Sequence, residues 1–240
     1  MTKRNKTARL AGLTYLILII FGILNLLYFP KRFIVWDNAA LTYQNIVQSE
    51  LLFRFSIVSG IIMSLSFMIL PFVLYKLLKK ANKTQAKLMV IFVLMSIPIS
   101  LTNILNKFAV LTLINKPAYL QHIPNTELET QVMLHMDYYS NGIEISQIFW
   151  GLWLLPFGYL VYKSGFLPKI LGIFLMIGCF GYLTAFFGGF LFENYSKTLF
   201  STLVDIPSSI GEIGICLWLL IMGTNKMSLK KGTKTIRPDS

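Results

Sequence analysis

Histidine, cysteine and acidic residues are scarce in this sequence, and each scarcity removes a class of site. The 240 residues include 2 cysteines, 2 histidines and 10 acidic residues. Cys179 and Cys216 both lie in apolar runs, so a disulfide framework is not expected. Two histidines without a His-x-x-x-His or His-Glu-x-x-His pattern argue against a catalytic zinc, and we predict no metal site.

Nucleotide-binding and hydrolase motifs are missing as well. The sequence has no Gly-x-Ser-x-Gly elbow, no phosphate-binding P-loop and no dinucleotide fingerprint. These absences disfavour a kinase, an ATPase or a Rossmann-type enzyme. We therefore predict no cofactor.

Apolar residues, in contrast, make up 55% of the chain, while charged residues make up 13%. That balance is far from the composition of soluble domains. Six apolar segments are long enough to cross a hydrocarbon layer of about 30 Å as helices. We predict an all-α integral membrane bundle of six transmembrane helices, at residues 10–29, 51–78, 88–114, 138–163, 167–192 and 205–223.

The first apolar segment follows a basic stretch, as the apolar core of a secretory signal peptide does. It is longer than such a core, and Pro30-Lys31-Arg32 follows it instead of a small-residue cleavage site. We therefore interpret residues 10–29 as an uncleaved first span.

The positive charge of the chain, formally +12, falls in short runs between the apolar segments. This distribution favours anionic lipid headgroups at the cytoplasmic face as a partner and argues against nucleic acid. Because cytoplasmic loops are enriched in Lys and Arg, the runs place both termini in the cytoplasm. The predicted parts are a basic cytoplasmic tail at 1–9, the transmembrane domain at 10–223 and a second basic cytoplasmic tail at 224–240.

Polar residues follow helical spacing inside several of the apolar segments. In the fourth segment, Glu144 and Gln147 share a face with the small residues Gly151 and Gly158. In lipid, such a face is expected to turn toward other helices. Similar stripes are Ser96, Ser100, Asn103 and Lys107 in the third segment, and Asp205, Ser209, Glu212 and Cys216 in the sixth.

Three ionisable residues from different segments fall at a similar predicted depth. Lys107, Glu144 and Glu212 would each lie roughly 8–10 Å below the outer surface, at 1.5 Å per residue. An isolated charge in lipid costs at least about 2.5–3.5 kcal/mol, so we expect these side chains to face each other, a wet cavity, or both. The predicted ligand-binding residues are Asn103, Lys107, Glu144, Gln147 and Glu212.

A purely structural role for these charges stays open, in which Lys107 pairs with one glutamate to hold helices in register. Further residues are weaker candidates for the same cavity. Asp37 is also a candidate N-cap of a short surface helix, and Arg54 lies close enough to the span end to reach the headgroups. The secondary candidates are Asn25, Asp37, Arg54, His135, Asp137, Asp205 and Ser209.

Several motifs together resemble the bacterial membrane-protein family catalogued as domain of unknown function 4386. They are the Asp37…Ala40-x-Thr42-x-x-Asn45-Ile46…Glu50-x-x-Phe53-Arg54 pattern, the Gly158-Tyr159-Leu160-Val161-Tyr162-Lys163-Ser164-Gly165-Phe166-Leu167-Pro168 block, and Glu212…Leu217-Trp218-Leu219-Leu220…Gly223. The resemblance runs from about Arg9 to Gly223, and the Ser-Gly-Phe-Leu-Pro turn is its most specific part. It implies a multi-pass protein of the bacterial inner (plasma) membrane and carries over no catalytic residue.

Three functions are compatible with these patterns. The first is binding or transport of a small polar or amphiphilic ligand in a cavity in the outer half of the bundle. The second is an intramembrane enzyme acting on lipid or peptide, with Glu144 or Glu212 as general base and His135 or Asp137 nearby. The third is a non-catalytic sensor or assembly subunit, which predicts no cavity around Glu144. The sequence indicates neither the ligand nor the oligomeric state.

Overall fold

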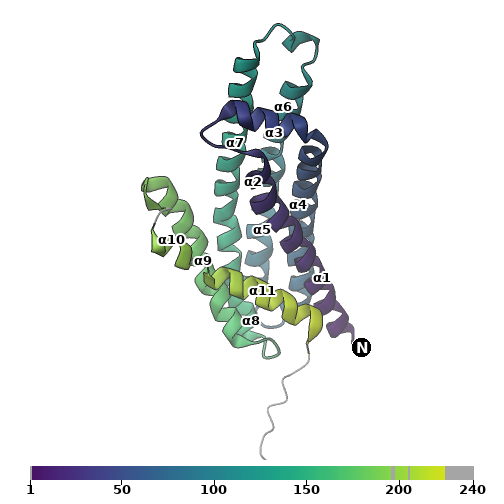
Figure 1. The fold of residues 1–240 in the computed structure, drawn as a ribbon. Coiled ribbons are helices and arrows are strands. Elements are labelled where there is room, and N and C mark those ends of the chain that lie inside the picture. Colours follow the sequence, from purple (N-terminus) through teal and green to yellow (C-terminus); the bar gives the residue numbers. More distant parts are fainter. Residues whose placement is uncertain (1, 196–197, 205, 225–240) are drawn as a thin grey trace, which may run out of the picture.

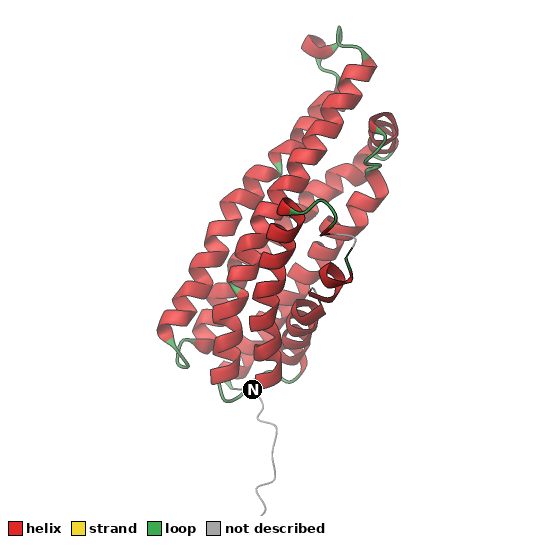
Figure 2. Ribbon diagram, turned by 90° about the vertical axis from the view of Figure 1, so that its left-hand side faces the viewer, coloured by secondary structure: helices red, strands yellow, loops and turns green. Residues whose placement is uncertain are grey.

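The computed structural model describes residues 2–195, 198–204 and 206–224. Within these ranges the chain forms helices and connecting loops and contains no strand (Figure 2). This confirms the predicted all-α class and the number of spans. The helical segments that are long and apolar enough to cross a membrane are Lys3–Phe33, Glu50–Leu78, Lys83–Asn115, Asn125–Lys163, Lys169–Leu191 and Leu199–Ile221.

Four of these segments are built from more than one helical element. The first comprises α1 (Lys3–Ile23), the π-helical turn η1 (Leu24–Tyr28) and α2 (Phe29–Phe33). The second is α4 (Glu50–Leu78), and the fifth is α9 (Lys169–Leu191). The others are α5 (Lys83–Asn103) with α6 (Leu105–Asn115), α7 (Asn125–Leu152) with α8 (Leu154–Lys163), and α10 (Leu199–Val204) with α11 (Ile206–Ile221); α3 (Ala39–Gln48) and the 3-10 turn η2 (Ala118–Leu120) lie in connections.

Several helices extend beyond the predicted spans into polar residues, whereas α9 is slightly shorter than its predicted span of 167–192. The third segment begins at Lys83 instead of residue 88, because Asn82 caps it by accepting a hydrogen bond from the backbone N–H of Gln85 at 3.0 Å. The fourth begins at Asn125 instead of residue 138. The length of an apolar run predicts the part of a helix that lies in lipid. It does not predict the polar turns by which the helix continues beyond the lipid.

A short helix, α3, lies across one end of the bundle, which we call the α3 end (Figure 1). Its N-cap is Asn38, whose Oδ1 accepts from the backbone N–H of Leu41 at 2.9 Å. The prediction that Asp37 caps this helix is therefore wrong, and Asp37 is exposed one residue earlier. The Thr42 hydroxyl holds α3 against the connection that follows the first segment by bonding both backbone groups of Val35.

The opposite end of the bundle carries the N-terminus (Figure 1). There the backbone N–H of Thr224 donates to Asn5 Oδ1 at 3.0 Å, so the chain leaves the sixth segment beside the start of the first. Residues 3–9, predicted as a tail, form the first turns of α1. Residues 225–240, the rest of the predicted C-terminal tail, lie outside the described residues. Which side of the membrane this end faces stays a prediction from charge.

The core between the ends contains both packed aromatic rings and close glycine contacts between helices. Trp153 stacks on Phe157 with ring centroids 5.0 Å apart, and Phe67 meets Trp153 edge-on at 5.2 Å. Where α8 meets α9, Gly158 faces Gly172 so closely that an added Cβ would lie 2.5 Å from the Gly172 carbonyl oxygen. These glycines bring the fifth segment into direct backbone contact with the fourth.

Candidate functional site

Lys107 is the centre of a buried polar cluster in the half of the bundle nearer α3. Only 3% of the residue is exposed, and its Nζ donates a hydrogen bond to Asn25 Oδ1 at 2.9 Å. The same ammonium lies 4.2 Å from the ring centroid of Tyr139. The Tyr139 hydroxyl also donates to Asn25 Oδ1, at 3.4 Å. Three membrane-spanning segments therefore meet at one amide oxygen.

An irregular turn of the first segment carries Asn25. The π-helical turn Leu24–Tyr28 interrupts the α-helical ladder, and such turns are frequent at functional sites. Gly60 of α4 provides the space for this amide, since an added Cβ would lie 2.8 Å from Asn25 Nδ2. The turn and the glycine together let an amide side chain occupy the middle of the bundle.

The third segment is interrupted at the same level. Asn106 Nδ2 donates to the backbone carbonyl of Asn103 at 3.2 Å. The Lys107 N–H instead bonds the Ile104 carbonyl three residues back, at 3.0 Å. This exchange of partners accounts for the break between α5 and α6. Asn103 Nδ2 then links the break to the fourth segment by donating to the Tyr139 carbonyl at 2.8 Å.

His135 and Asn106 form the edge of the cluster nearest α3. The His135 Nδ1 lies 3.2 Å from Asn106 Oδ1, and both residues are half-buried. The cluster therefore extends from the buried ammonium of Lys107 to the partly exposed imidazole of His135, between α6 and α7. We call the set Asn25, Asn103, Asn106, Lys107, His135 and Tyr139 the Lys107 centre.

Glu212 lies elsewhere, which overturns the predicted layer of three charges. Its carboxyl accepts hydrogen bonds from Tyr15 at 2.8 Å and from Tyr182 at 3.2 Å. Tyr15 and Asn25 are ten residues apart on the first segment, about 15 Å along a helix, so Glu212 and Lys107 lie at different depths. The prediction had measured depth from Asp205, which lies outside the described residues, whereas the sixth segment begins at Leu199.

Glu144 is not part of the Lys107 centre either. It is exposed, and it makes no hydrogen bond or ion pair with any residue that the structure describes. Two turns further along the same face, Gly151 packs against α9, where an added Cβ would lie 2.6 Å from Tyr182 Cβ. The polar face of the fourth segment was predicted to pack against other helices. It does so at Gly151, whereas Glu144 is exposed and Gln147, between them, is half-buried.

The secondary candidates are mostly peripheral. Arg54 is exposed and pairs with Glu50 at 2.6 Å, the only ion pair among the described residues. Asp137 and Ser209 are exposed as well. Among the residues that the structure describes, no three His, Cys, Asp or Glu side chains are grouped as metal ligands would be.

The geometry that the enzyme hypothesis required is not formed. His135 contacts an amide, and Glu144 lies nine residues further along α7, about 13 Å away along the helix axis. A general base and its proton donor must lie within about 3 Å or be bridged by one water. Glu212 is bonded to tyrosines of other segments and is not near His135 in depth.

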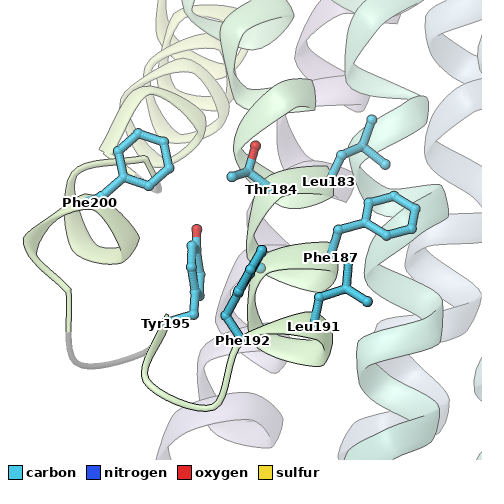
Figure 3. A pocket seen from close by; sticks show the side chains of 8 residues that line it. Leu183, Thr184, Phe187, Leu191, Phe192, Tyr195 and Phe200 are labelled. Atoms are coloured by element: carbon cyan, nitrogen blue, oxygen red, sulfur yellow. The ribbon is translucent and has the colours of Figure 1, made fainter.

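A shallow groove of about 400 Å³ lies between α9 and the chain that follows it (Figure 3). Leu183, Phe187 and Leu191 of α9 form one wall, and Phe200 stands on the other (Figure 3). Its single α9 hydroxyl, on Thr184, already donates to the Phe180 carbonyl at 2.6 Å. The groove is therefore apolar and separate from the Lys107 centre, as expected for a surface in contact with acyl chains.

Some residues of these clusters carried little signal in the sequence. Tyr139 lies next to the exposed Tyr138 near the start of the fourth predicted span, yet it is buried, with 5% exposure. Asn106 is not among the predicted site residues, although it lies three residues after Asn103 and directly before Lys107 in the same apolar segment. Tyr15 and Tyr182 were indistinguishable from core aromatics, because only the fold reveals that both reach Glu212.

Comparisons with known proteins supply relatives of this chain but no activity. An archaeal protein from Archaeoglobus fulgidus, described as uncharacterized, is 34% identical over 84 residues, which cover 34% of this chain and 46% of that protein. The match thus spans less than half the length of the relative. No solved structure matches the chain. A family profile described as a domain of unknown function (DUF4386) matches residues 10–223, nearly the whole chain, and the protein therefore belongs to the DUF4386 family.

Proposed function

We propose that the protein binds the anionic group of a small or amphiphilic ligand at the Lys107 centre, as a multi-pass protein of the bacterial inner membrane. In this proposal both termini are cytoplasmic, so that the ligand reaches the centre from the outer half of the bundle. The observation that carries the proposal is a buried ammonium without a carboxylate partner among the described residues.

Lys107 has unused capacity for an anion. A lysine ammonium has three N–H donors, and the described residues supply one oxygen acceptor, Asn25 Oδ1, together with the face of the Tyr139 ring. A cation inside a membrane bundle is costly unless an opposite charge lies nearby. A carboxylate or phosphate group would supply that charge through a charge-assisted hydrogen bond.

The helix irregularities support ligand access. The π-helical turn at Asn25 and the break after Asn103 lie on two of the three segments whose side chains meet at the Lys107 centre. Interrupted helices at ligand sites are a recurring feature of membrane transporters, because freed backbone and side-chain groups then face the ligand. The half-buried His135 and Asn106 would form the entrance.

A binding experiment with two sources of the same chemistry tests the proposal. The purified protein is titrated with inorganic phosphate in detergent, and separately reconstituted in nanodiscs of phosphatidylcholine with or without phosphatidylglycerol. Thermal unfolding is followed in both cases. We expect the anion to raise the unfolding temperature of the wild type and to leave that of Lys107→Met unchanged, because a ligand that binds only the folded state stabilises it. An effect of phosphate indicates a soluble anion, and an effect of phosphatidylglycerol alone indicates a lipid headgroup.

Lys31→Met is the matched control, because Lys31 is an exposed lysine of the first segment at the α3 end. It should respond to the anion as the wild type does. Equal stabilisation of the wild type and Lys107→Met by both anion sources would refute binding at this centre, as would no stabilisation by either.

A second candidate function, an assembly subunit, is favoured by the exposed face of α7. Asn141 and Glu144 are both exposed on a membrane-spanning segment, beyond the point where α9 covers it. Polar groups facing lipid are costly, and a partner helix would cover them. Native mass spectrometry should then detect an oligomer in the wild type that Glu144→Leu weakens and Ile145→Leu, a neighbouring exposed position, does not. A wild type that is monomeric in lipid would exclude self-assembly through this face.

A further inference from the structure

A second polar cluster lies where three segments meet around Glu212. Tyr15 of α1 donates to Glu212 Oε2 at 2.8 Å, and Tyr182 of α9 donates to Oε1 at 3.2 Å. Each carboxyl oxygen therefore has its own hydroxyl donor, supplied by a different segment. Glu212 itself is partly buried on α11. This arrangement holds one acidic side chain in a defined position between helices.

The surroundings of Glu212 contain no basic side chain within ion-pair distance among the described residues. The titratable groups that face it are Tyr15, Tyr182 and, one turn along α11, Cys216, whose thiol donates to the Gly12 carbonyl at 3.5 Å. Tyr15 also packs against Trp153, with ring centroids 6.0 Å apart. The carboxyl thus lies among tyrosines, a thiol and aromatic rings.

Close helix contacts exclude bulkier groups from the same region. An added Cβ on Gly211 would lie 2.9 Å from the backbone nitrogen of Leu175, and one on Gly178 would lie 2.8 Å from Ser208 Cα. The α9 and α11 backbones are therefore in close contact at two levels of α11 next to Glu212. Such packing leaves room for the smallest cation, a proton, more readily than for a hydrated metal ion.

We propose that Glu212 is a proton-binding site inside the membrane-spanning bundle. In uptake, a carboxylate oxygen of Glu212 takes a proton from hydronium and leaves water, and in release the reverse transfer occurs. The ionised form can accept both tyrosine hydroxyls, whose oxygens lie 2.8 and 3.2 Å from the carboxyl oxygens. The neutral form can donate its own O–H to a tyrosine oxygen, because a phenolic oxygen also accepts hydrogen bonds. The longer contact, to Tyr182, is the one that this reversal would use.

This inference goes beyond ligand binding at Lys107 and stands independently of it. The two clusters share only the first segment, on which Tyr15 and Asn25 lie about 15 Å apart along the helix. A carboxyl that gains and loses a proton inside a bundle is a recurring element of membrane proton relays. Its presence would give the protein a means to respond to protons, whatever binds at Lys107.

Infrared spectroscopy of the protein in nanodiscs, recorded over a series of pH values, tests the site directly. A protonated carboxyl has a C=O stretching band that an ionised carboxylate lacks. We expect a carboxylic-acid band that appears reversibly as the pH falls and that is absent from Glu212→Gln. The exposed carboxyl of Glu144 provides the control, and Glu144→Gln should retain the band. A carboxylic-acid band of the same intensity and pH dependence in Glu212→Gln as in the wild type would overturn the proposal.

Tyr182→Phe keeps the test decisive if Glu212→Gln does not fold. This variant preserves the carboxyl and removes one hydrogen-bond partner, so the C=O band should persist and move to higher wavenumber. The unfolding temperature and size-exclusion profile of each variant establish that it is folded. A titrating band at the wild-type position in both Tyr15→Phe and Tyr182→Phe would show that its carboxyl is not Glu212.

Discussion

A lysine inside a membrane bundle needs acceptors for its N–H groups and a neighbour for its charge. Lys107 obtains an amide oxygen from Asn25 and an aromatic face from Tyr139, and neither carries a full negative charge. Glu212 is the reverse case, a carboxyl that receives two hydroxyl donors and no cation among the described residues. The sequence predicts that the two side chains face each other or a shared wet cavity, whereas each has its own set of neutral partners.

The bond between Lys107 and Asn25 can be measured as a coupling energy. Asn25→Leu removes the one amide acceptor that the described residues offer to a buried ammonium, and we expect the free energy of unfolding to fall by about 1–3 kcal/mol. Lys107→Met removes the ammonium that donates to Asn25. Asn25→Leu should therefore lower the free energy of unfolding by less in the Lys107→Met background than in the wild type. Reversible unfolding in mixed micelles provides the four free energies of this double-mutant cycle. Strictly additive effects would contradict the contact.

At the scale of elements, small residues and helix irregularities decide how the segments pack. The break between α7 and α8 follows from Pro156, which has no N–H to offer the Leu152 carbonyl four residues earlier. The break between α5 and α6 has a different cause, the Asn106 side chain, which takes the Asn103 carbonyl. Both breaks change the direction or rotation of the residues that follow, and so they determine which side chains meet.

The glycine contact between α8 and α9 should be sensitive to a single methyl group. In Gly158→Ala the new Cβ would lie 2.5 Å from the Gly172 carbonyl oxygen, which is backbone and cannot rotate away. We expect the free energy of unfolding to fall by about 1–3 kcal/mol. Gly189→Ala is the matched control on α9, because nothing lies within 4 Å of an added Cβ there. Equal stability of the two variants would show that the contact is looser than described.

At the scale of the whole molecule, an even number of crossings brings both described ends of the chain together. The hydrogen bond between Thr224 and Asn5 reports this directly. The α3 end differs in character, because α3 lies across the bundle and the α6–α7 connection projects beyond it (Figure 1). Lys79 and Lys80, in the basic connection between α4 and α5, lie at the end that carries the N-terminus (Figure 1). This asymmetry is the basis for predicting that the termini are cytoplasmic.

Cysteine labelling in intact cells tests that orientation. Lys80 and Gln121 are exposed and belong to connections at opposite ends of the bundle. We expect a membrane-impermeant maleimide to label Gln121→Cys in intact cells and Lys80→Cys only after permeabilisation. The native Cys179 and Cys216 are buried, so the unmodified protein provides the background signal. The reverse pattern of labelling would invert the predicted topology.

The polar stripe of the third segment shows how far sequence reasoning reached into the site. Ser96, Ser100, Asn103 and Lys107 were predicted to share a face, and all four are buried. Helical spacing is a local property, so the face could be read from the chain. The partner of that face was predicted wrongly, because Lys107 meets Asn25 and Tyr139 instead of Glu144 and Glu212.

The sequence by itself determined the helical class, the six spans and the polar faces, because apolar length and residue spacing are properties of one segment at a time. The tertiary structure decided which charges meet. That outcome depends on the depth and rotation of each helix, which a π-helical turn at Asn25, a break after Asn103 and the start of the sixth segment at Leu199 all alter. These displacements result from contacts between distant segments. A depth counted along an ideal helix therefore cannot include them.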